Sequence, residues 1–265
     1  MLDRCRLCGS DDVRPWMTDG RNQDLIYYKC GKCTLWNYDL AQGLDQMQYT
    51  EEYINPLDTE HKANVDIRQS WDFLNSQLPV PGSIMDVGCG NAGLLHLARE
   101  ANWQVTGMEL SAPAAQAIRE NQNIDVIVGD FLEYENTEGR QYDVVVLRHV
   151  LEHLPDSILA MKRIGSLLKN NGVALLEFPN TQSFAYAIKR VLKNRGLRNK
   201  KYSADWRPGH TNEFCRKSFE YLLGKTDFEL LVWRTYSSKP AANIFYRLVP
   251  YGSKARVLVR KKRTP

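Results

Sequence analysis

Apolar residues recur along the chain in short runs, which are separated by segments with helical spacing. Five runs predict buried strands, at residues 84–87, 104–108, 125–128, 142–147 and 173–178. Two later runs, at residues 228–236 and 255–260, predict two more strands. Apolar residues at helical spacing predict a helix over residues 61–78, and Pro79 and Pro81 end it. Strands that alternate with helices in this way indicate an α/β fold with a largely parallel sheet.

A glycine-rich loop follows the first of these strands. Residues 84–93 read IMDVGCGNAG, so Asp86 lies at the end of the strand and three glycines lead into a helix. Glycine lets the backbone approach a ligand closely, and the helix N-terminus then faces that ligand. Glu109 ends the next strand, 19 residues beyond Gly90, and an acid near this spacing accepts hydrogen bonds from ribose hydroxyls. The pattern predicts a nucleotide-containing cofactor at the carboxyl ends of the strands.

Several motifs together resemble one family, the class I S-adenosylmethionine-dependent methyltransferases, over roughly residues 49–262. The matching stretches are MDVGCG (85–90), GMELS (107–111), VGD (128–130), YDVVVLRHVLEHLPD (142–156) and LKNNGVALLE (168–177). The resemblance implies a Rossmann-like seven-stranded sheet, in which the last strand lies antiparallel between the fifth and the sixth. A nicotinamide-dependent enzyme is the alternative for the loop alone. The methyltransferase motifs that follow the loop, in place of a second nucleotide-binding half, argue against it.

The resemblance also implies roles around S-adenosylmethionine. The first residues of the loop are implied to surround the methionine end, Glu109 to hold the ribose, and Asp130 with Phe131 to border the adenine. The complete expected set is Asp86, Gly88, Cys89, Gly90, Glu109, Leu110, Asp130, Phe131, Arg148 and Tyr53. Tyr53 or Tyr49 is expected to close over the cofactor. The alternative for these tyrosines is packing against the sheet.

Four of the six cysteines form two pairs near the start of the chain. Cys5 and Cys8, and then Cys30 and Cys33, each enclose two residues, with 21 residues between the pairs. This spacing is typical of a zinc site with four cysteine ligands, and such a closed coordination shell is structural rather than catalytic. Strands over residues 13–17 and 25–29 would complete a zinc ribbon spanning residues 1–42, followed by the methyltransferase domain over residues 43–265. Disulfides are the alternative, which an expected cytoplasmic location disfavours.

Charge is distributed unevenly along the chain. The net charge is +4, but residues 1–183 carry 15 Lys and Arg against 26 Asp and Glu, a balance of −11, and residues 184–265 carry 20 against 5, a balance of +15. No apolar run approaches the roughly 18 residues needed to span a bilayer, and the first residues lack the apolar core of a secretory signal. The expected location is the cytoplasm. The basic part indicates an anionic acceptor, a membrane surface or nucleic acid as partner.

Histidines near the predicted cleft are the candidate general bases. His149 and His153 lie in HVLEH, which directly follows the fourth strand and also spells a metalloprotease motif. We reject the protease reading because the stretch matches the methyltransferase segment. His210 lies in a basic insertion, residues 180–213, where this fold usually builds acceptor pockets. Structural roles are the alternative for all three histidines.

Residues 184–201 contain seven basic residues and no acid. Within them Phe184, Ile188, Val191 and Leu192 share one helical face, which predicts contact with an anionic membrane, a lid over the site, or simple packing.

The leading function is methyl transfer to a small-molecule or glycan acceptor, phosphorylated or linked to a nucleotide or lipid, as in similar enzymes of polysaccharide biosynthesis. An RNA methyltransferase and a non-catalytic cofactor-binding scaffold are the alternatives. The chain has no Asn-Pro-Pro-Tyr type of tetrad after the fourth strand, which argues against an RNA methyltransferase. The intact cofactor motifs argue against a scaffold without activity. The acceptor atom and the oligomeric state stay open.

Overall fold

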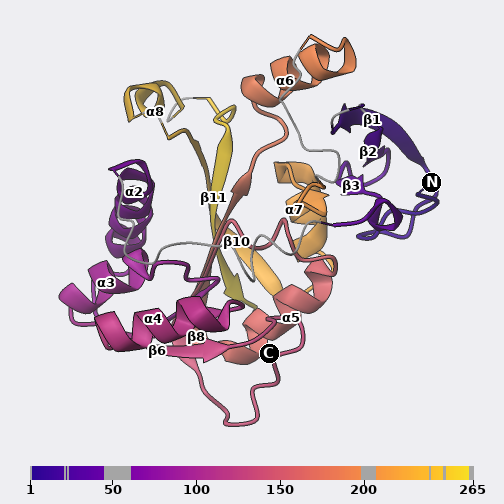
Figure 1. Cartoon of the computed structure of the whole chain (residues 1–265). Helices are drawn as coiled ribbons and strands as arrows, with labels where there is room; N and C mark the ends of the chain where they lie inside the picture. Colours follow the sequence, from indigo (N-terminus) through magenta and orange to yellow (C-terminus); the bar gives the residue numbers. More distant parts are fainter. Residues whose placement is uncertain are drawn as a thin grey trace.

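The computed structural model describes residues 2–20, 22, 24–44, 61–197, 207–238, 240–246 and 249–262. Within them the larger of two sheets has seven strands, in the order β10-β11-β8-β7-β4-β5-β6 (Figure 1). They are β4 (Ser83–Val87), β5 (Gln104–Glu109), β6 (Asp125–Val128), β7 (Tyr142–Arg148), β8 (Leu168–Pro179), β10 (Phe228–Tyr236) and β11 (Lys254–Lys261). The pairs among β4 to β8 are parallel, and β11 is antiparallel to both β8 and β10. The predicted α/β sheet with an antiparallel last strand is confirmed.

Helices cover both faces of this sheet. The helices α2 (His61–Gln77), α3 (Gly93–Glu100) and α4 (Ala112–Gln122) contribute to one apolar core, and α5 (Ser157–Leu167) and α7 (Arg216–Leu223) contribute to the other. Side chains alternate along a strand, so Ile84 and Val144 join the first core while Met85 and Val145 join the second. The sheet is therefore buried on both sides, and its polar strand ends are the part available to a ligand.

The smaller sheet is formed by the amino-terminal segment together with a strand from far along the chain. β1 (Val13–Asp19), β2 (Leu25–Cys30) and β3 (Trp36–Tyr38) pair antiparallel, followed by the 3-10 turn η1 (Leu40–Gln42). The two strands predicted in the ribbon are confirmed. β9 (Asn212–Glu213) then adds to β3, and the Arg6 guanidinium donates hydrogen bonds to the Tyr38 carbonyl at 2.6 Å and to Asn212 Oδ1 at 3.2 Å. The ribbon is thus joined to the segment that carries His210, while the boundary at residue 42 stays a prediction.

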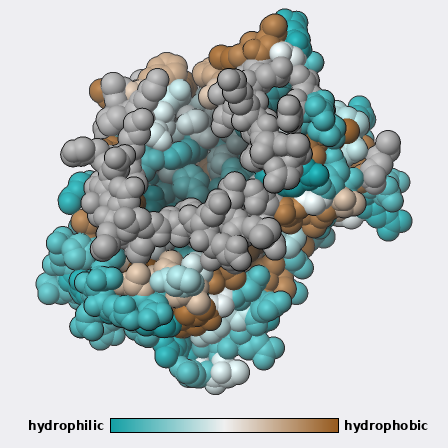
Figure 2. All heavy atoms as spheres, in the orientation of Figure 1, coloured by the Kyte–Doolittle hydropathy of each residue, from teal (hydrophilic) through white to brown (hydrophobic). Residues whose placement is uncertain are grey.

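Helix α6 (Phe184–Asn194) lies beside the ribbon (Figure 1). Lys193 forms an ion pair with Asp19, and Asn194 Nδ2 donates to the Trp16 carbonyl at 3.2 Å. Phe184 contacts Tyr251, with ring centroids 5.0 Å apart, but Phe184 and Ile188 are each more than half exposed, so much of the apolar stripe stays accessible. Figure 2 shows these apolar side chains at the upper margin of the molecule, with those of α8 (Pro240–Tyr246) across a hydrophilic hollow.

No helix in the described parts of the chain has both the length and the apolarity needed to cross a bilayer.

Candidate cofactor and acceptor site

The glycine loop between β4 and α3 has a backbone that few other residues adopt. Gly88 and Gly90 have φ values of 68° and 55°, in the left-handed region that glycine tolerates without strain. A Cβ atom at Gly88 would lie 2.6 Å from Val150 Cγ2, so the turn after β7 is packed directly against the loop. The expected cofactor loop and the expected catalytic segment are therefore neighbours.

Glu109 closes this loop from the end of β5. Its two carboxylate oxygens accept hydrogen bonds from Gly90 N at 3.0 Å and from Ser111 N at 3.1 Å, and the side chain is buried. A carboxylate has about four acceptor positions, so accepting two backbone donors leaves capacity for ribose hydroxyls. The location and the remaining acceptors fit the expected ribose contact.

Asp86 is a buried acid at the end of β4. Burial, opposed by Arg148, raises its pKa to about 7. Its Oδ1 atom is buried and has no hydrogen-bond partner among the described residues. A buried acceptor without a partner is costly, and the ammonium group of a bound methionine moiety would satisfy it. The residues of the loop therefore fit S-adenosylmethionine.

The residues expected around the adenine separate into exposed and buried ones. Leu110 and the neighbouring Val128 are each 41% exposed, whereas Phe131 is 4% exposed and belongs to the core. Asp130 is exposed, and its carboxylate accepts from Leu132 N at 2.7 Å. Leu110 and Val128 thus offer the open apolar surface at this edge, and Val128 was not among the expected residues.

Cys89 is buried within the loop, and burial raises the pKa of its thiol. A Cβ atom at Gly107 would lie 2.8 Å from Cys89 Sγ, so the glycine in β5 provides the space for this side chain. The contact favours packing over direct cofactor binding for Cys89. Tyr53 and Tyr49 lie outside the described residues.

Arg148, at the end of β7, takes part in a buried ionic network. Its Nε donates to Glu177 Oε2 at 3.0 Å, and Arg256 forms an ion pair with the other oxygen of Glu177. Ser70 and Tyr236 also donate to Glu177, at 2.9 and 3.1 Å. Burial alone would raise the pKa of Glu177, but the two arginines outweigh it and lower that pKa to about 2. Arg148 is therefore held by a structural partner as well as facing Asp86.

Other polar side chains at the strand ends are also engaged in hydrogen bonds within the protein. Asn180, which follows β8, donates from Nδ2 to the Gly252 carbonyl at 3.0 Å. The contacts of Glu177 and Asn180 favour structural roles for both side chains.

The three candidate histidines gather beside the loop. His149 has a φ of 56°, which is unusual for a residue other than glycine and is often found at functional sites. Its Nδ1 lies 3.2 Å from Glu152 Oε1. The rings of His153 and His210 meet edge to face, with centroids 4.7 Å apart. The structure thus brings together residues from the turn after β7 and from the segment before β9.

His210 is held by a second carboxylate. Its Nδ1 lies 3.0 Å from Glu213 Oε1, and the Tyr186 hydroxyl donates to Glu213 Oε2 at 2.9 Å. Burial would lower the pKa of His210, but Glu213 outweighs it and raises that pKa to about 9. Glu152, Glu213 and Tyr186 were not predicted as site residues. Of these three residues, only Glu152 lies in a motif, HVLEH, that could have identified it from the sequence.

The four amino-terminal cysteines lie close together in the ribbon. Cys5 Sγ is 3.5 Å from Cys33 Sγ, and Cys8 Sγ is 3.5 Å from Cys30 Sγ. All four sulfur atoms lie within 4.8 Å of one another, and all four cysteines are free. A disulfide needs sulfur atoms about 2.05 Å apart, whereas four thiolates around zinc lie farther apart. The donor set therefore fits a zinc ion.

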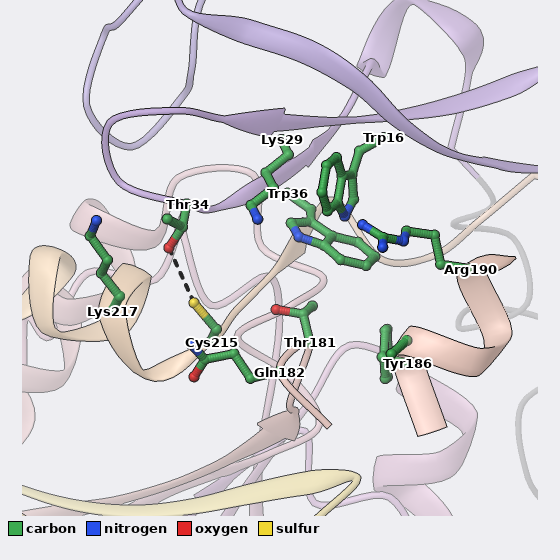
Figure 3. A pocket seen from close by; sticks show the side chains of 11 residues that line it. Trp16, Lys29, Thr34, Trp36, Thr181, Gln182, Tyr186, Arg190, Cys215 and Lys217 are labelled. Carbon is green, nitrogen blue, oxygen red and sulfur yellow. Dashed lines mark hydrogen bonds between the residues drawn. The ribbon is translucent and has the colours of Figure 1, made fainter. Parts of the chain in front are cut away.

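A hollow of about 180 Å³ lies between the ribbon, α6 and α7 (Figure 3). Lys29, Arg190 and Lys217 reach it from three different elements, and the described lining residues include no acid. Trp16 lies between two of these cations, with Lys29 Nζ 4.2 Å and Arg190 Cζ 4.0 Å from its ring centroid. The hollow combines positive charge with aromatic walls.

Comparisons with known proteins agree with this geometry. A family model described as "Methyltransferase domain" matches residues 59–232. The ubiquinone biosynthesis O-methyltransferase of Xanthomonas campestris is 26% identical over 123 residues, which are 44% of this chain and 52% of that protein. N-methyltransferase 4 of Papaver somniferum is 30% identical over 107 residues, 37% of this chain and 30% of that protein. The chain thus spans about half the length, or less, of these curated relatives.

Solved structures share the fold at low sequence identity. The 1,6-didemethyltoxoflavin-N1-methyltransferase of Burkholderia thailandensis, solved with S-adenosylhomocysteine, is 16% identical with a TM-score of 0.53, covering 74% of this chain and 78% of that one. The magnesium protoporphyrin IX methyltransferase of Synechocystis, also solved with S-adenosylhomocysteine, is 16% identical with a TM-score of 0.54, covering 76% and 84%. Because the family model spans more than half of the residues, this chain belongs to the methyltransferase-domain family.

Proposed function

We propose that this protein transfers the methyl group of S-adenosylmethionine to an oxygen atom of a small-molecule or glycan acceptor that carries an anionic group. The observation that carries the proposal is the junction of the glycine loop with Glu109 and Asp86, directly against the turn of His149. The matches to O-methyltransferases favour oxygen as the accepting atom. The activity is tested by incubating the protein with S-adenosylmethionine and phosphorylated or nucleotide-linked sugars, and measuring S-adenosylhomocysteine. If S-adenosylhomocysteine forms at the same rate with and without each of these acceptors, the proposal is contradicted.

The residues divide the work between binding and proton removal. S-adenosylmethionine supplies a methyl group already activated on a sulfonium, so the placement of the acceptor matters most. Asp86 and Glu109 hold the cofactor from the ends of β4 and β5. His149 lies beside the loop in a strained backbone conformation and is the proposed general base for an acceptor hydroxyl. His153 and His210 line the same acceptor side.

Glu109→Ala is expected to weaken the binding of S-adenosylhomocysteine more than tenfold. The substitution removes a charged acceptor for the ribose and the partner of Gly90 N, and hydrogen bonds to charged groups contribute about 1.5–3 kcal/mol each. Isothermal titration calorimetry measures the change. Glu100→Ala, at the exposed end of α3, is the matched control and should bind normally. Equal affinity of Glu109→Ala and wild type would remove Glu109 from the cofactor site.

The anionic part of the acceptor is proposed to bind in the hollow of Figure 3. Lys29 and Arg190 provide positive charge beside Trp16 (Figure 3), and Lys217 adds a third cation to the lining. Arginine and lysine bind phosphate through charge-assisted hydrogen bonds. Tyr186 lines the hollow and also donates to Glu213, which holds His210. The hollow is therefore joined to the histidine cluster by one chain of contacts, which suits an acceptor anchored at one end and methylated at the other.

The double variant Lys29→Gln/Arg190→Gln is expected to bind inorganic pyrophosphate at least tenfold more weakly than wild type, because it removes two of the three cations. The affinity for S-adenosylhomocysteine should stay unchanged. Calorimetry at fixed ionic strength measures both affinities. Lys32→Gln, on the exposed surface of the ribbon, is the control for a general loss of charge. If the double variant and the control bind pyrophosphate equally, the anion binds elsewhere.

Two further parts of the proposal concern the ribbon and α6. Cys5, Cys8, Cys30 and Cys33 are proposed to hold a structural zinc ion. Peripheral contact with a membrane through residues 184–201 stays a prediction, supported by the exposed apolar side chains of Phe184, Ile188 and Val191 next to basic residues. Nucleic acid is the less favoured partner.

A further inference from the structure

Three potential metal ligands converge between the turn after β7 and the segment before β9. The carboxylate of Glu152 and the imidazoles of His153 and His210 each offer one ligand atom, and these atoms lie within 4.8 Å of one another. Donors bound to one zinc or similar ion lie about 2.0–2.2 Å from it, so a small rotation of these side chains brings all three into range. The cluster is separate from the four cysteines of the ribbon.

Each of the two histidines has its Nδ1 atom fixed by a hydrogen-bond acceptor of the chain. His153 Nδ1 donates to the Gly209 carbonyl at 3.0 Å, which places its lone pair on Nε2. His210 Nδ1 lies against the Glu213 carboxylate, and Glu213 is itself fixed by the Tyr186 hydroxyl. Metal-bound histidines commonly donate their other ring N–H to a carbonyl or a carboxylate in this way. Glu213 and Tyr186 are thus positioning residues.

The buried carboxylate of Glu152 favours a bound cation. The residue is fully buried. Its Oε1 contacts His149, while its Oε2 is buried with no hydrogen-bond partner in the described part of the chain. A buried carboxylate oxygen without a donor carries a large desolvation cost. A metal ion bound between this oxygen and the two Nε2 atoms would remove that cost.

We propose that Glu152, His153 and His210 bind a divalent transition-metal ion on the acceptor side of the cleft. Two imidazoles and one carboxylate suit ions such as Zn²⁺, Co²⁺, Fe²⁺ or Mn²⁺ and leave coordination positions open. Because Glu213 keeps His210 protonated, the ion displaces the Nε2 proton of His210 to solvent when it binds. An acceptor hydroxyl bound there would lose its proton more readily. His149 or solvent takes that proton, and the O–CH₃ bond forms as the S–CH₃ bond of S-adenosylmethionine breaks, which releases neutral S-adenosylhomocysteine. The role of the ion in transfer rests on the proposed function, but its binding does not.

The test uses the full chain with its ribbon loaded with zinc and weakly bound metal removed by brief dialysis against a chelator. Calorimetric titration with CoCl₂ should show one further Co²⁺ bound per wild-type chain. Glu152→Gln and His210→Gln should each weaken this binding at least tenfold. Glu213→Gln should weaken it by about 10- to 100-fold, as the loss of other outer-shell partners does. His96→Gln, an exposed histidine paired with Glu100, should bind Co²⁺ as wild type does.

No uptake of Co²⁺ beyond the ribbon, or equal uptake by wild type and the His210→Gln variant, would overturn the proposal. The His210 side chain is about one-third exposed, so this variant is expected to fold even if the buried Glu152→Gln does not, and circular dichroism checks both. Co²⁺ uptake is measured without S-adenosylmethionine. Failure of the metal site therefore leaves cofactor binding intact, and failure of methyl transfer leaves Co²⁺ uptake intact.

Discussion

Cys30→Ser is expected to lower the zinc content by one equivalent per chain and to unfold the amino-terminal sheet. Cys30 ends β2 and its sulfur lies beside that of Cys8. Serine at this position removes one of the four thiolates that are proposed to bind zinc and so to join the two cysteine pairs. Structural zinc contributes about 10–16 kcal/mol of apparent binding free energy in small zinc-finger peptides, far more than the ribbon's few strands can replace. Metal analysis by mass spectrometry measures the zinc.

Hydrogen exchange measures the structural part of the same prediction. The amides of the β1–β2 ladder should exchange much faster in Cys30→Ser, and the effect should reach β9 because β9 pairs with β3. Cys215→Ser is the matched control. Cys215 is buried outside the cluster and contacts the Thr34 hydroxyl, so this variant should keep its zinc. Wild-type protein that contains no zinc, or a Cys30→Ser variant with full zinc content, would contradict the ribbon assignment.

Glu177→Gln is expected to lower the free energy of unfolding by about 3–5 kcal/mol, as the loss of one partner from a buried ion pair does. Glu177 is completely buried and neutralises part of the charge of Arg148 and Arg256. Glutamine keeps the shape but removes the negative charge that the two buried guanidinium groups share. Urea denaturation measures the change.

The control is an exposed pair between the same types of residue. Glu229→Gln breaks the contact with Arg260 across β10 and β11, where both side chains are partly exposed, and it should cost less than about 1 kcal/mol. If the two variants are equally stable, Glu177 does not hold the network together.

The pH dependence gives a second readout of Glu177. Its folded-state pKa of about 2 lies below its ordinary value of 4.5, so its contribution to stability is complete above about pH 4.5 and is lost as the pH falls toward 2. Between these values the wild type should lose stability more steeply than Glu177→Gln. Parallel pH profiles for the two proteins would show that the carboxylate is not stabilised in the folded state.

The fold was predictable because the strands of the large sheet have strong local signals. Ile84, Val144 and their neighbours form short runs that are mostly apolar, as expected for parallel strands buried on both faces. β9 was not predictable, because its two residues, Asn212 and Glu213, are polar and pair with a strand more than 170 positions earlier in the chain. The stripe of Phe184 and Ile188 was visible in the sequence, but periodicity reveals only that a helix has an apolar side, not where that side points.

The candidate site was predictable where a motif fixes both residue and spacing. Asp86, Gly88 and Glu109 lie together because a strand, a tight turn and the next strand bring them to one edge of the sheet. The ion-pair and hydrogen-bond partners of Glu177 come from distant segments, and the role of Glu213 beside His210 depends on the three-dimensional fold. No local sequence pattern predicts such contacts. Glu152 lies in a motif that was noticed, but its burial and its unpartnered oxygen are three-dimensional facts.

A crystal structure of the complex with S-adenosylhomocysteine tests the central claim most directly. The proposed function predicts that the ribose hydroxyls bind the Glu109 carboxylate, that the methionine amino group lies within hydrogen-bond distance of Asp86 Oδ1, and that the sulfur faces the turn of His149. A ligand bound away from the glycine loop, or a sulfur that points away from the histidine cluster, would contradict it.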